Sequence, residues 1–382
     1  MTRTVIFCKK AYDPSALTAM FPAAEVCVLR GEITAETLRR YEGCRLIFAL
    51  PNAGLQAATA LCRDGGFAEV LVFPYDARSD LREPIPADVS KPRLDYFETE
   101  ISETCNLNCR GCCDFCNLLS GRRFYDFDVF RADLARLRSL FWGVERIRLM
   151  GGEPLLNPRL AEYVEESRAV FPDSDLRIVT NGLLIPTLSP ETLARIKAAE
   201  CSFDISNYPP TRAKKAEIEK TLRAAGVRYN LGLPVHIFLR NLRQTPSDDP
   251  APAFRNCIFT HCHMLGSGRL APCSYAYCAG RFNDRFGQTY PETDYVDLSD
   301  PDLDGWDILR RFSAPHDFCR CCGSGISPIR WKGGCLRAAA RPEDWQIPPT
   351  FFNEYLLPVA QRILKPTAVK LRALVQKKHE ET

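Results

Sequence analysis

The feature that most constrains this fold is a run of apolar strands and amphipathic helices in strict alternation, which begins at Leu94. The pattern predicts strands at 95–102, 145–150, 176–180, 202–206 and 227–233, and helices at 128–141, 159–171, 190–199 and 214–226. Successive βα repeats place a parallel sheet beneath helices, and their right-handed connections curve the sheet toward a barrel. We therefore predict an α/β fold with a partial (β/α)6 barrel of the TIM type at 94–245.

A shorter alternation of the same kind precedes the barrel. Apolar strands near 4–8, 25–30, 45–51 and 69–74 are separated by helical patterns, which predicts a small parallel α/β domain at 1–88. This domain has no Gly-x-Gly-x-x-Gly sequence, so we expect a scaffold or substrate-docking role instead of a nucleotide site. Proline and charge concentrate at 77–93, which is typical of a linker.

Cysteine is the unusual component, with 18 thiols in 382 residues. The first residues contain no apolar signal stretch before the polar Lys9-Lys10 pair, so we expect a reducing, cytoplasmic compartment. No apolar run approaches the ~20 residues of a membrane span. The 50 basic residues exceed the 47 acidic ones by only three, which gives no indication of a nucleic-acid partner. We therefore expect the thiols to act as core packing, metal ligands or redox groups.

Three cysteines with short spacings follow the first barrel strand. Cys105, Cys109 and Cys112 lie at the carboxyl end of that strand, where active sites of barrels are built. Three thiolates so close can bind three irons of a 4Fe–4S cluster and leave one iron open, since such cubes usually take four cysteines. Two further thiols, Cys113 and Cys116, allow other pairings, including the set of Cys109, Cys112 and Cys116.

The spacing Cys105-x3-Cys109-x2-Cys112, followed by the segment Gly151-Gly152-Glu153-Pro154, resembles the radical S-adenosylmethionine (SAM) superfamily over about 94–234. The resemblance implies that SAM binds the open iron and that the Gly-Gly-Glu-Pro segment contacts its methionyl amino group. Glycines suit such a place because the backbone itself must approach the ligand. One departure is Gly111, where many members of the family carry an aromatic residue.

The resemblance also implies chemistry. It implies reductive cleavage of SAM to a 5′-deoxyadenosyl radical that abstracts a substrate hydrogen, driven by an external low-potential donor such as a flavodoxin or ferredoxin. Ser206 and Asn181 match positions that contact SAM near its ribose. Both residues also suit ordinary turns at strand ends, which is the simpler alternative.

A second set of cysteines resembles the auxiliary-cluster domains called twitch and SPASM. Its order and spacing match the shorter twitch domain, which binds one auxiliary 4Fe–4S cluster through four thiolates, here Cys257, Cys273, Cys319 and Cys322. The predicted domain spans 254–340, and we expect it to be organised by metal, with little helical periodicity.

Several alternatives at this second site stay open. Cys262 competes with Cys257 for the first position, and the four thiolates also suit structural zinc, with His261 and His263 nearby. We expect Cys278, Cys321 and Cys335 to be packing thiols.

Residues 350–382 form a basic, amphipathic tail that Pro358 and Pro366 interrupt. The tail can contact an anionic membrane surface, or pack on the protein with a solvated basic face.

Taken together, the motifs predict a radical SAM enzyme with a small-molecule or peptide substrate. Oxidation of a sugar or cyclitol is the preferred reaction, and peptide modification is the alternative within the class. A non-catalytic iron–sulfur or zinc protein is the alternative from another class. The segment from Gly151 to Pro154 argues against it, because a protein that never binds SAM does not need that segment.

Overall fold

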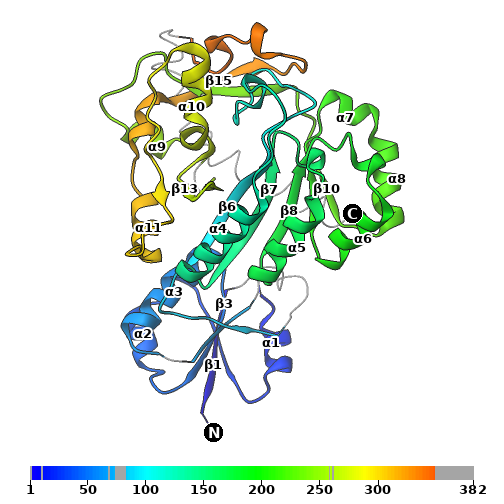
Figure 1. Cartoon of the computed structure of the whole chain (residues 1–382). Helices are drawn as coiled ribbons and strands as arrows, with labels where there is room; N and C mark the ends of the chain where they lie inside the picture. Colours follow the sequence, from blue (N-terminus) through cyan, green and yellow to red (C-terminus); the bar gives the residue numbers. More distant parts are fainter. Residues whose placement is uncertain are drawn as a thin grey trace.

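The computed structural model describes residues 2–9, 12–67, 69–73, 83–257, 259 and 262–348. Figure 1 shows an N-terminal unit at the bottom, the larger sheet in the middle and the cysteine-rich segments at the top. His261 and the predicted tail at 350–382 lie outside the described residues. The described residues contain no helix long and apolar enough to cross a membrane.

The N-terminal unit is a five-stranded sheet with helices packed on it. Its strands are β1 (Thr4–Cys8), β2 (Glu25–Val28), β3 (Arg45–Ala49), β4 (Val70–Val72) and β5 (Ile85–Pro86), and its helices are α1 (Pro14–Met20), α2 (Ala35–Arg39) and α3 (Asn52–Asp64). The first four strands pair in parallel, as expected. The segment expected to be only a linker instead contributes β5, antiparallel to β4, because Ile85 packs against the apolar core of this unit.

The larger sheet contains five parallel strands in sequence order. They are β6 (Arg93–Ser102), β7 (Gly143–Gly151), β8 (Asp175–Thr180), β9 (Ser202–Ile205) and β10 (Tyr229–Leu231), with helices α4 (Phe127–Leu140), α5 (Leu160–Val170), α6 (Pro190–Ala198), α7 (Pro209–Ala213) and α8 (Lys215–Ala225). Asp126 and Ser189 cap the N-termini of α4 and α6 with their side chains. The predicted α/β fold with a partial barrel of parallel strands is confirmed.

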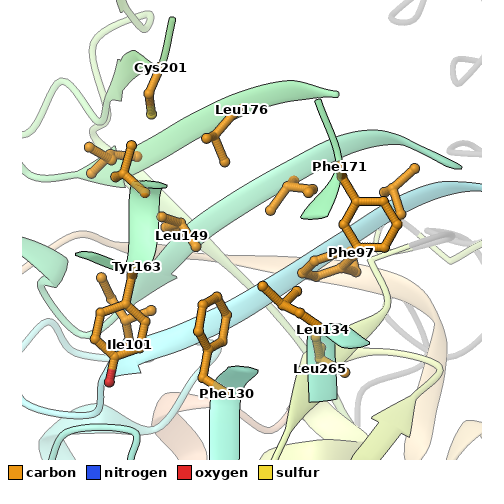
Figure 2. Close-up of a cluster of buried hydrophobic side chains, with 14 of the residues drawn as sticks. Phe97, Ile101, Phe130, Leu134, Leu149, Tyr163, Phe171, Leu176, Cys201 and Leu265 are labelled. Carbon is orange, nitrogen blue, oxygen red and sulfur yellow. The ribbon is translucent and has the colours of Figure 1, made fainter. Parts of the chain in front are cut away.

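The two faces of this sheet differ sharply in chemistry. Alternate residues such as Phe97, Leu149 and Leu176 pack with Phe130 and Tyr163 of α4 and α5 into the main core, which Figure 2 shows. Because side chains alternate along a strand, the intervening residues lie on the helix-free face. Those residues are mostly charged, so the core sits between sheet and helices while the barrel interior is polar.

A hairpin from the cysteine-rich region extends the barrel sheet beside β6. The strands β12 (Met264–Gly266) and β13 (Arg269–Ala271) are followed by β14 (Val296–Asp297), and β12 runs parallel to β6. Ser267 and Gly268 both have positive φ, which the tight hairpin turn requires. The sixth strand of the barrel sheet is therefore borrowed from beyond residue 254, where the βα rhythm gave no indication of it.

The cysteine-rich region has a core of its own. It contains β11 (Ile237–Leu242) paired with β15 (Cys322–Arg330), and helices α9 (Ala251–Arg255), α10 (Ser274–Phe286) and α11 (Gly305–Phe312). Phe115, Tyr275, Phe282 and Trp345 are buried together. The expectation of little helical structure here was wrong, because the aromatic face of the 13-residue α10 supplies an apolar core.

A pocket of about 200 Å³ opens at the amino ends of β8 to β10. Asp175, Glu200 and Arg228 line it, together with Glu83 and Ile85 from the N-terminal unit. Barrel enzymes carry their chemistry at the opposite, carboxyl ends of the strands. The pocket is therefore separate from the candidate site described below.

Candidate active site at the carboxyl ends of the strands

The three-cysteine loop begins three residues after β6 and holds its thiols among hydrogen-bond donors. The Leu107 backbone N–H donates to Cys105 Sγ at 3.4 Å, and Trp331 Nε1 donates to Cys109 Sγ at 3.3 Å. Burial raises the pKa of Cys105 to about 12 and also raises that of Cys109. A buried thiol of this kind ionises when a metal binds it, so the donor set suits iron.

Two further thiols, Cys113 and Cys116, lie close to Cys112. Interactions with the Cys113 and Cys116 thiols hold the pKa of Cys112 well below its ordinary value. Cys113 Sγ lies 3.6 Å from Asp114 Oδ1, and Cys116 Sγ lies 4.0 Å from Glu100 Oε1. Ligand atoms of Cys112, Asp114 and Cys116 all lie within 4.8 Å of one another. Cys112 also interacts electrostatically with Cys105 and Cys109, so it joins the two groups of thiols.

The glycines after β7 are required by the chain itself. Gly151 has φ +129°, and a Cβ there would lie 2.1 Å from the Ser102 carbonyl oxygen. A Cβ on Gly152 would lie 2.5 Å from the Thr104 backbone. The N–H of Gly152 donates to Ser102 O, and that of Glu153 donates to Thr104 O. Backbone hydrogen bonds thus join the Gly-Gly-Glu segment to the residues that lead into the three-cysteine loop.

Glu153 organises the next strand end. Its buried carboxylate accepts hydrogen bonds from Thr180 Oγ1 at 2.6 Å, Asn181 N at 2.9 Å and Leu155 N at 3.1 Å. Burial raises the pKa of Glu153 to about 7, although these hydrogen bonds oppose the shift. Pro154 begins the short 3-10 helix η3 (Pro154–Leu156) directly after it.

The other two predicted SAM contacts lie at adjacent strand ends. Asn181 Nδ2 donates to the Asn106 side chain at 2.7 Å, which brings the end of β8 against the three-cysteine loop. Ser206 follows β9, and its backbone N–H bonds to Thr180 O at 2.9 Å. The structure therefore brings the cysteines, Asn181 and Ser206 to one edge of the barrel sheet.

A segment far along the chain covers the three-cysteine loop, and we call residues 331–345 the strap. Trp331 stacks on Tyr208 with ring centroids 5.4 Å apart, and Arg110 forms an ion pair with Asp344. The strap makes four further hydrogen bonds to the loop: Arg110 N to Lys332 O, Gly334 N to Leu107 O, Cys335 N to Asn108 O, and Trp345 Nε1 to Cys112 O. Sequence reasoning missed the strap, because no motif marks it.

The strap explains the glycine before the third cysteine. Gly111 has φ +70°, and a Cβ there would lie 2.7 Å from the Asp344 carbonyl oxygen. An aromatic side chain at this position would displace the strap. The departure from the family pattern therefore has a local steric cause.

We expect Gly111→Ala to destabilise the protein more than Gly121→Ala does. Both glycines have positive φ, which costs an alanine about 1–2 kcal/mol, but the Gly121 Cβ would meet nothing within 4 Å. The clash at Gly111 should add about 1–3 kcal/mol, as other overpacked sites do. Urea unfolding of both variants measures the difference, and equal destabilisation would show that the strap yields freely.

The second set of cysteines is also brought together. Electrostatic interactions link Cys273 with Cys257 and Cys319, and link Cys322 with those same three thiols. The Phe259 N–H donates to Cys257 Sγ at 3.3 Å. These interactions show that the four predicted auxiliary thiols lie near one another, as an auxiliary cluster requires.

Two competitors at this site have different surroundings. Cys262 interacts with Cys257 and Cys273, and also with Glu98 and Arg148 of the barrel. His263 is buried, with Nδ1 at 3.3 Å from Pro272 O and Nε2 at 3.8 Å from Asp95. Both ring nitrogens of His263 therefore face oxygen atoms. The remaining thiols Cys278, Cys321 and Cys335 lie in the aromatic core of this region.

The helix-free face of the barrel sheet carries paired charges. Arg148 forms an ion pair with Asp204 at 2.9 Å and contacts the Tyr96 hydroxyl at 3.3 Å, while Arg177 lies 4.0 Å from Asp204. Tyr96 also donates to Glu98, and burial raises the pKa of Glu98 to about 7. The Arg148 and Asp204 side chains keep 27% and 21% of their surface exposed, so polar groups of a ligand can reach them.

Comparison with known proteins agrees with this arrangement. Residues 99–206 match the profile of the radical SAM superfamily. GTP 3′,8-cyclase of Aliarcobacter butzleri is 28% identical over 176 residues, which cover 43% of this chain and 52% of that protein. GTP 3′,8-cyclase of Lactiplantibacillus plantarum is 33% identical over 125 residues, covering 32% and 36%. The chain thus matches about half or less of these curated relatives.

Solved structures give weaker likenesses. The crystal structure of BtrN in complex with AdoMet and 2-DOIA covers 59% of this chain and 91% of its own, with 19% identity and a TM-score of 0.35. Native anSMEcpe with bound AdoMet covers 36% of this chain and 44% of its own, with 15% identity and a TM-score of 0.29.

The profile match includes the three-cysteine loop and the Gly-Gly-Glu-Pro segment. Residues 99–206 of this chain form a radical SAM domain, and this family uses a 4Fe–4S cluster and SAM.

Proposed function

We propose that this protein is a radical SAM enzyme whose SAM-binding cluster is held by Cys105, Cys109 and Cys112. The proposal rests on two backbone hydrogen bonds, from Gly152 N to Ser102 O and from Glu153 N to Thr104 O. They hold the Gly-Gly-Glu-Pro segment beside the start of the three-cysteine loop, at one edge of the barrel. Cys109 interacts with both Cys105 and Cys112, whereas the strongest interactions of Cys116 are with Cys112, Glu100 and Asp114 and include neither Cys105 nor Cys109; this supports the first set of three over Cys109, Cys112 and Cys116.

The residues of this site have separate tasks. When bound, the cluster and SAM supply the electron and the 5′-deoxyadenosyl group that abstracts a hydrogen atom from the substrate. Glu153 holds the end of β8 through Thr180 and Asn181, and presents a carboxylate beside the loop. Gly151, Gly152 and Pro154 shape the turn that lets this carboxylate be buried. Asn181 and Ser206 offer polar groups to the SAM ribose, and a flavodoxin or ferredoxin supplies the electron.

The auxiliary thiols support a second cluster in the same enzyme. Cys257, Cys273, Cys319 and Cys322 supply four thiolates, so each iron of a cube has its own ligand. Full ligation leaves no open iron for SAM or substrate. We propose that this cluster relays electrons.

We further propose that the substrate is a neutral, hydroxyl-rich molecule such as a sugar or cyclitol, which the enzyme oxidises. On the helix-free face, Arg148 pairs with Asp204 and Arg177 pairs with Asp175, each at 2.9 Å, so both arginines already have a carboxylate partner. Hydroxyl groups satisfy such a surface without introducing an unpaired charge. Peptide modification remains the alternative within the class.

A nucleotide substrate is the second candidate, since the named relatives are GTP 3′,8-cyclases. A triphosphate needs cations that are not already neutralised, and Asp204 and Asp175, which pair with Arg148 and Arg177, disfavour it. Incubation with GTP and with a cyclitol, each deuterated at carbon, separates the two. Transfer of deuterium into 5′-deoxyadenosine identifies the class that binds productively.

SAM binding provides the test of the site. In reconstituted, reduced protein, SAM should change the electron paramagnetic resonance (EPR) signal of one cluster, because SAM binds its open iron. A signal that SAM leaves unchanged would refute the assignment of this loop.

A further inference from the structure

Trp331 is held in place by three contacts around the three-cysteine loop. Its indole Nε1 donates to Cys109 Sγ at 3.3 Å, across 222 residues of sequence. Its ring stacks on Tyr208 at an interplanar angle of 19°, and its backbone N–H donates to His236 O at 2.9 Å. The stack on Tyr208 and the backbone hydrogen bond to His236 therefore hold the indole N–H toward the Cys109 sulfur.

We propose that Trp331 tunes the reduction potential of the cluster on the three-cysteine loop. The inference rests on the proposed function, because it requires Cys109 to be an iron ligand. A hydrogen bond to a ligating thiolate stabilises negative charge on the sulfur. The reduced cluster carries one more electron than the oxidised cluster, so the bond stabilises the reduced form more and makes the potential less negative.

The described residues offer no other side-chain N–H among the recorded hydrogen bonds to the sulfurs of Cys105, Cys109 and Cys112. Trp345, the other strap tryptophan, donates instead to the Cys112 carbonyl oxygen at 2.7 Å. The strap therefore contacts the loop through one tryptophan that reaches a sulfur and one that reaches only the backbone. This difference makes the two residues a matched pair for experiment.

The test replaces Trp331 by Phe, which keeps a stacking ring and removes the N–H. Full-length protein is reconstituted anaerobically without SAM, and the cluster potential is measured by redox titration followed by EPR. The signal that the Cys105, Cys109 and Cys112 triple alanine variant loses identifies the relevant cluster. Trp345→Phe tests loss of a strap contact that does not touch sulfur. Trp306→Phe is the general control, because the Trp306 ring packs on Arg63 and its Nε1 donates to Ser90 O.

We expect Trp331→Phe to retain iron and to shift the potential of that cluster to a more negative value, with no such shift in Trp306→Phe. An unchanged potential at full iron content would overturn the proposal. So would an equal shift in Trp345→Phe, which would point to loop packing, or loss of the cluster from a folded Trp331→Phe, which would point to assembly. Failure of the proposed function is distinct: the triple alanine variant would then keep the SAM-sensitive signal.

Discussion

Replacement of Cys105, Cys109 and Cys112 together by alanine should abolish SAM cleavage and leave a folded protein with about four irons in place of about eight, one cube being lost. The fold should survive because the main core lies between the sheet and its helices and does not include these thiols. The strap also bonds to backbone atoms of the loop, such as Leu107 O and Asn108 O, which alanine leaves unchanged. Iron analysis and detection of 5′-deoxyadenosine measure both effects.

Cys44→Ala is the matched control, since Cys44 packs at the core of the N-terminal unit. This variant should keep all its iron and its full rate of SAM cleavage. Cleavage at the wild-type rate in the triple variant would show that the cluster is held by other thiols, with Cys113 and Cys116 the first to examine.

Replacement of Cys257, Cys273, Cys319 and Cys322 by alanine should remove the other cluster, again leaving about four irons. The remaining cluster should still respond to SAM, because its three ligands lie on a different loop. EPR spectra with and without SAM, together with iron and zinc analysis, report this result. We expect weaker substrate turnover, since the proposed relay is lost.

The metal content of the triple variant decides between the two chemistries open to the auxiliary site. Zinc without iron there would make the cysteine-rich region a structural zinc domain. Cys262→Ala in otherwise wild-type protein tests the competing ligand, and full iron content is expected because Cys262 interacts more strongly with Glu98 and Arg148 of the barrel than with Cys273 and Cys257. Loss of about four irons in this variant would show that Cys262, in place of Cys257, is a ligand of the auxiliary cluster.

Local patterns predicted much of the fold. The alternation of strands and helices was sufficient for the five parallel strands β6 to β10, because each repeat buries its own apolar face. The same reasoning could not find β12 beside β6. That pairing joins Met264 to Glu98 across the chain and depends on tertiary packing of a hairpin with a three-residue strand.

The candidate site was likewise predicted only in part from the sequence. Short motifs indicated the cysteines and the Gly-Gly-Glu-Pro segment, and the resemblance to the family added Asn181 and Ser206. Close approach of a ligand to Gly152 stays a prediction, and the structure adds a steric reason for glycine, since a Cβ there would lie 2.5 Å from the Thr104 backbone. Trp331 was not predicted as part of the site, because a single tryptophan after a strand belongs to no motif and to no periodic pattern that would indicate a functional role.

The most direct test of this account is the formation of 5′-deoxyadenosine by the anaerobically reconstituted, chemically reduced protein in the presence of SAM. We expect 5′-deoxyadenosine and methionine to accumulate together, and the triple cysteine variant to form neither. Wild-type protein that carries both clusters and binds SAM but forms no 5′-deoxyadenosine, with or without the candidate substrates, would contradict it.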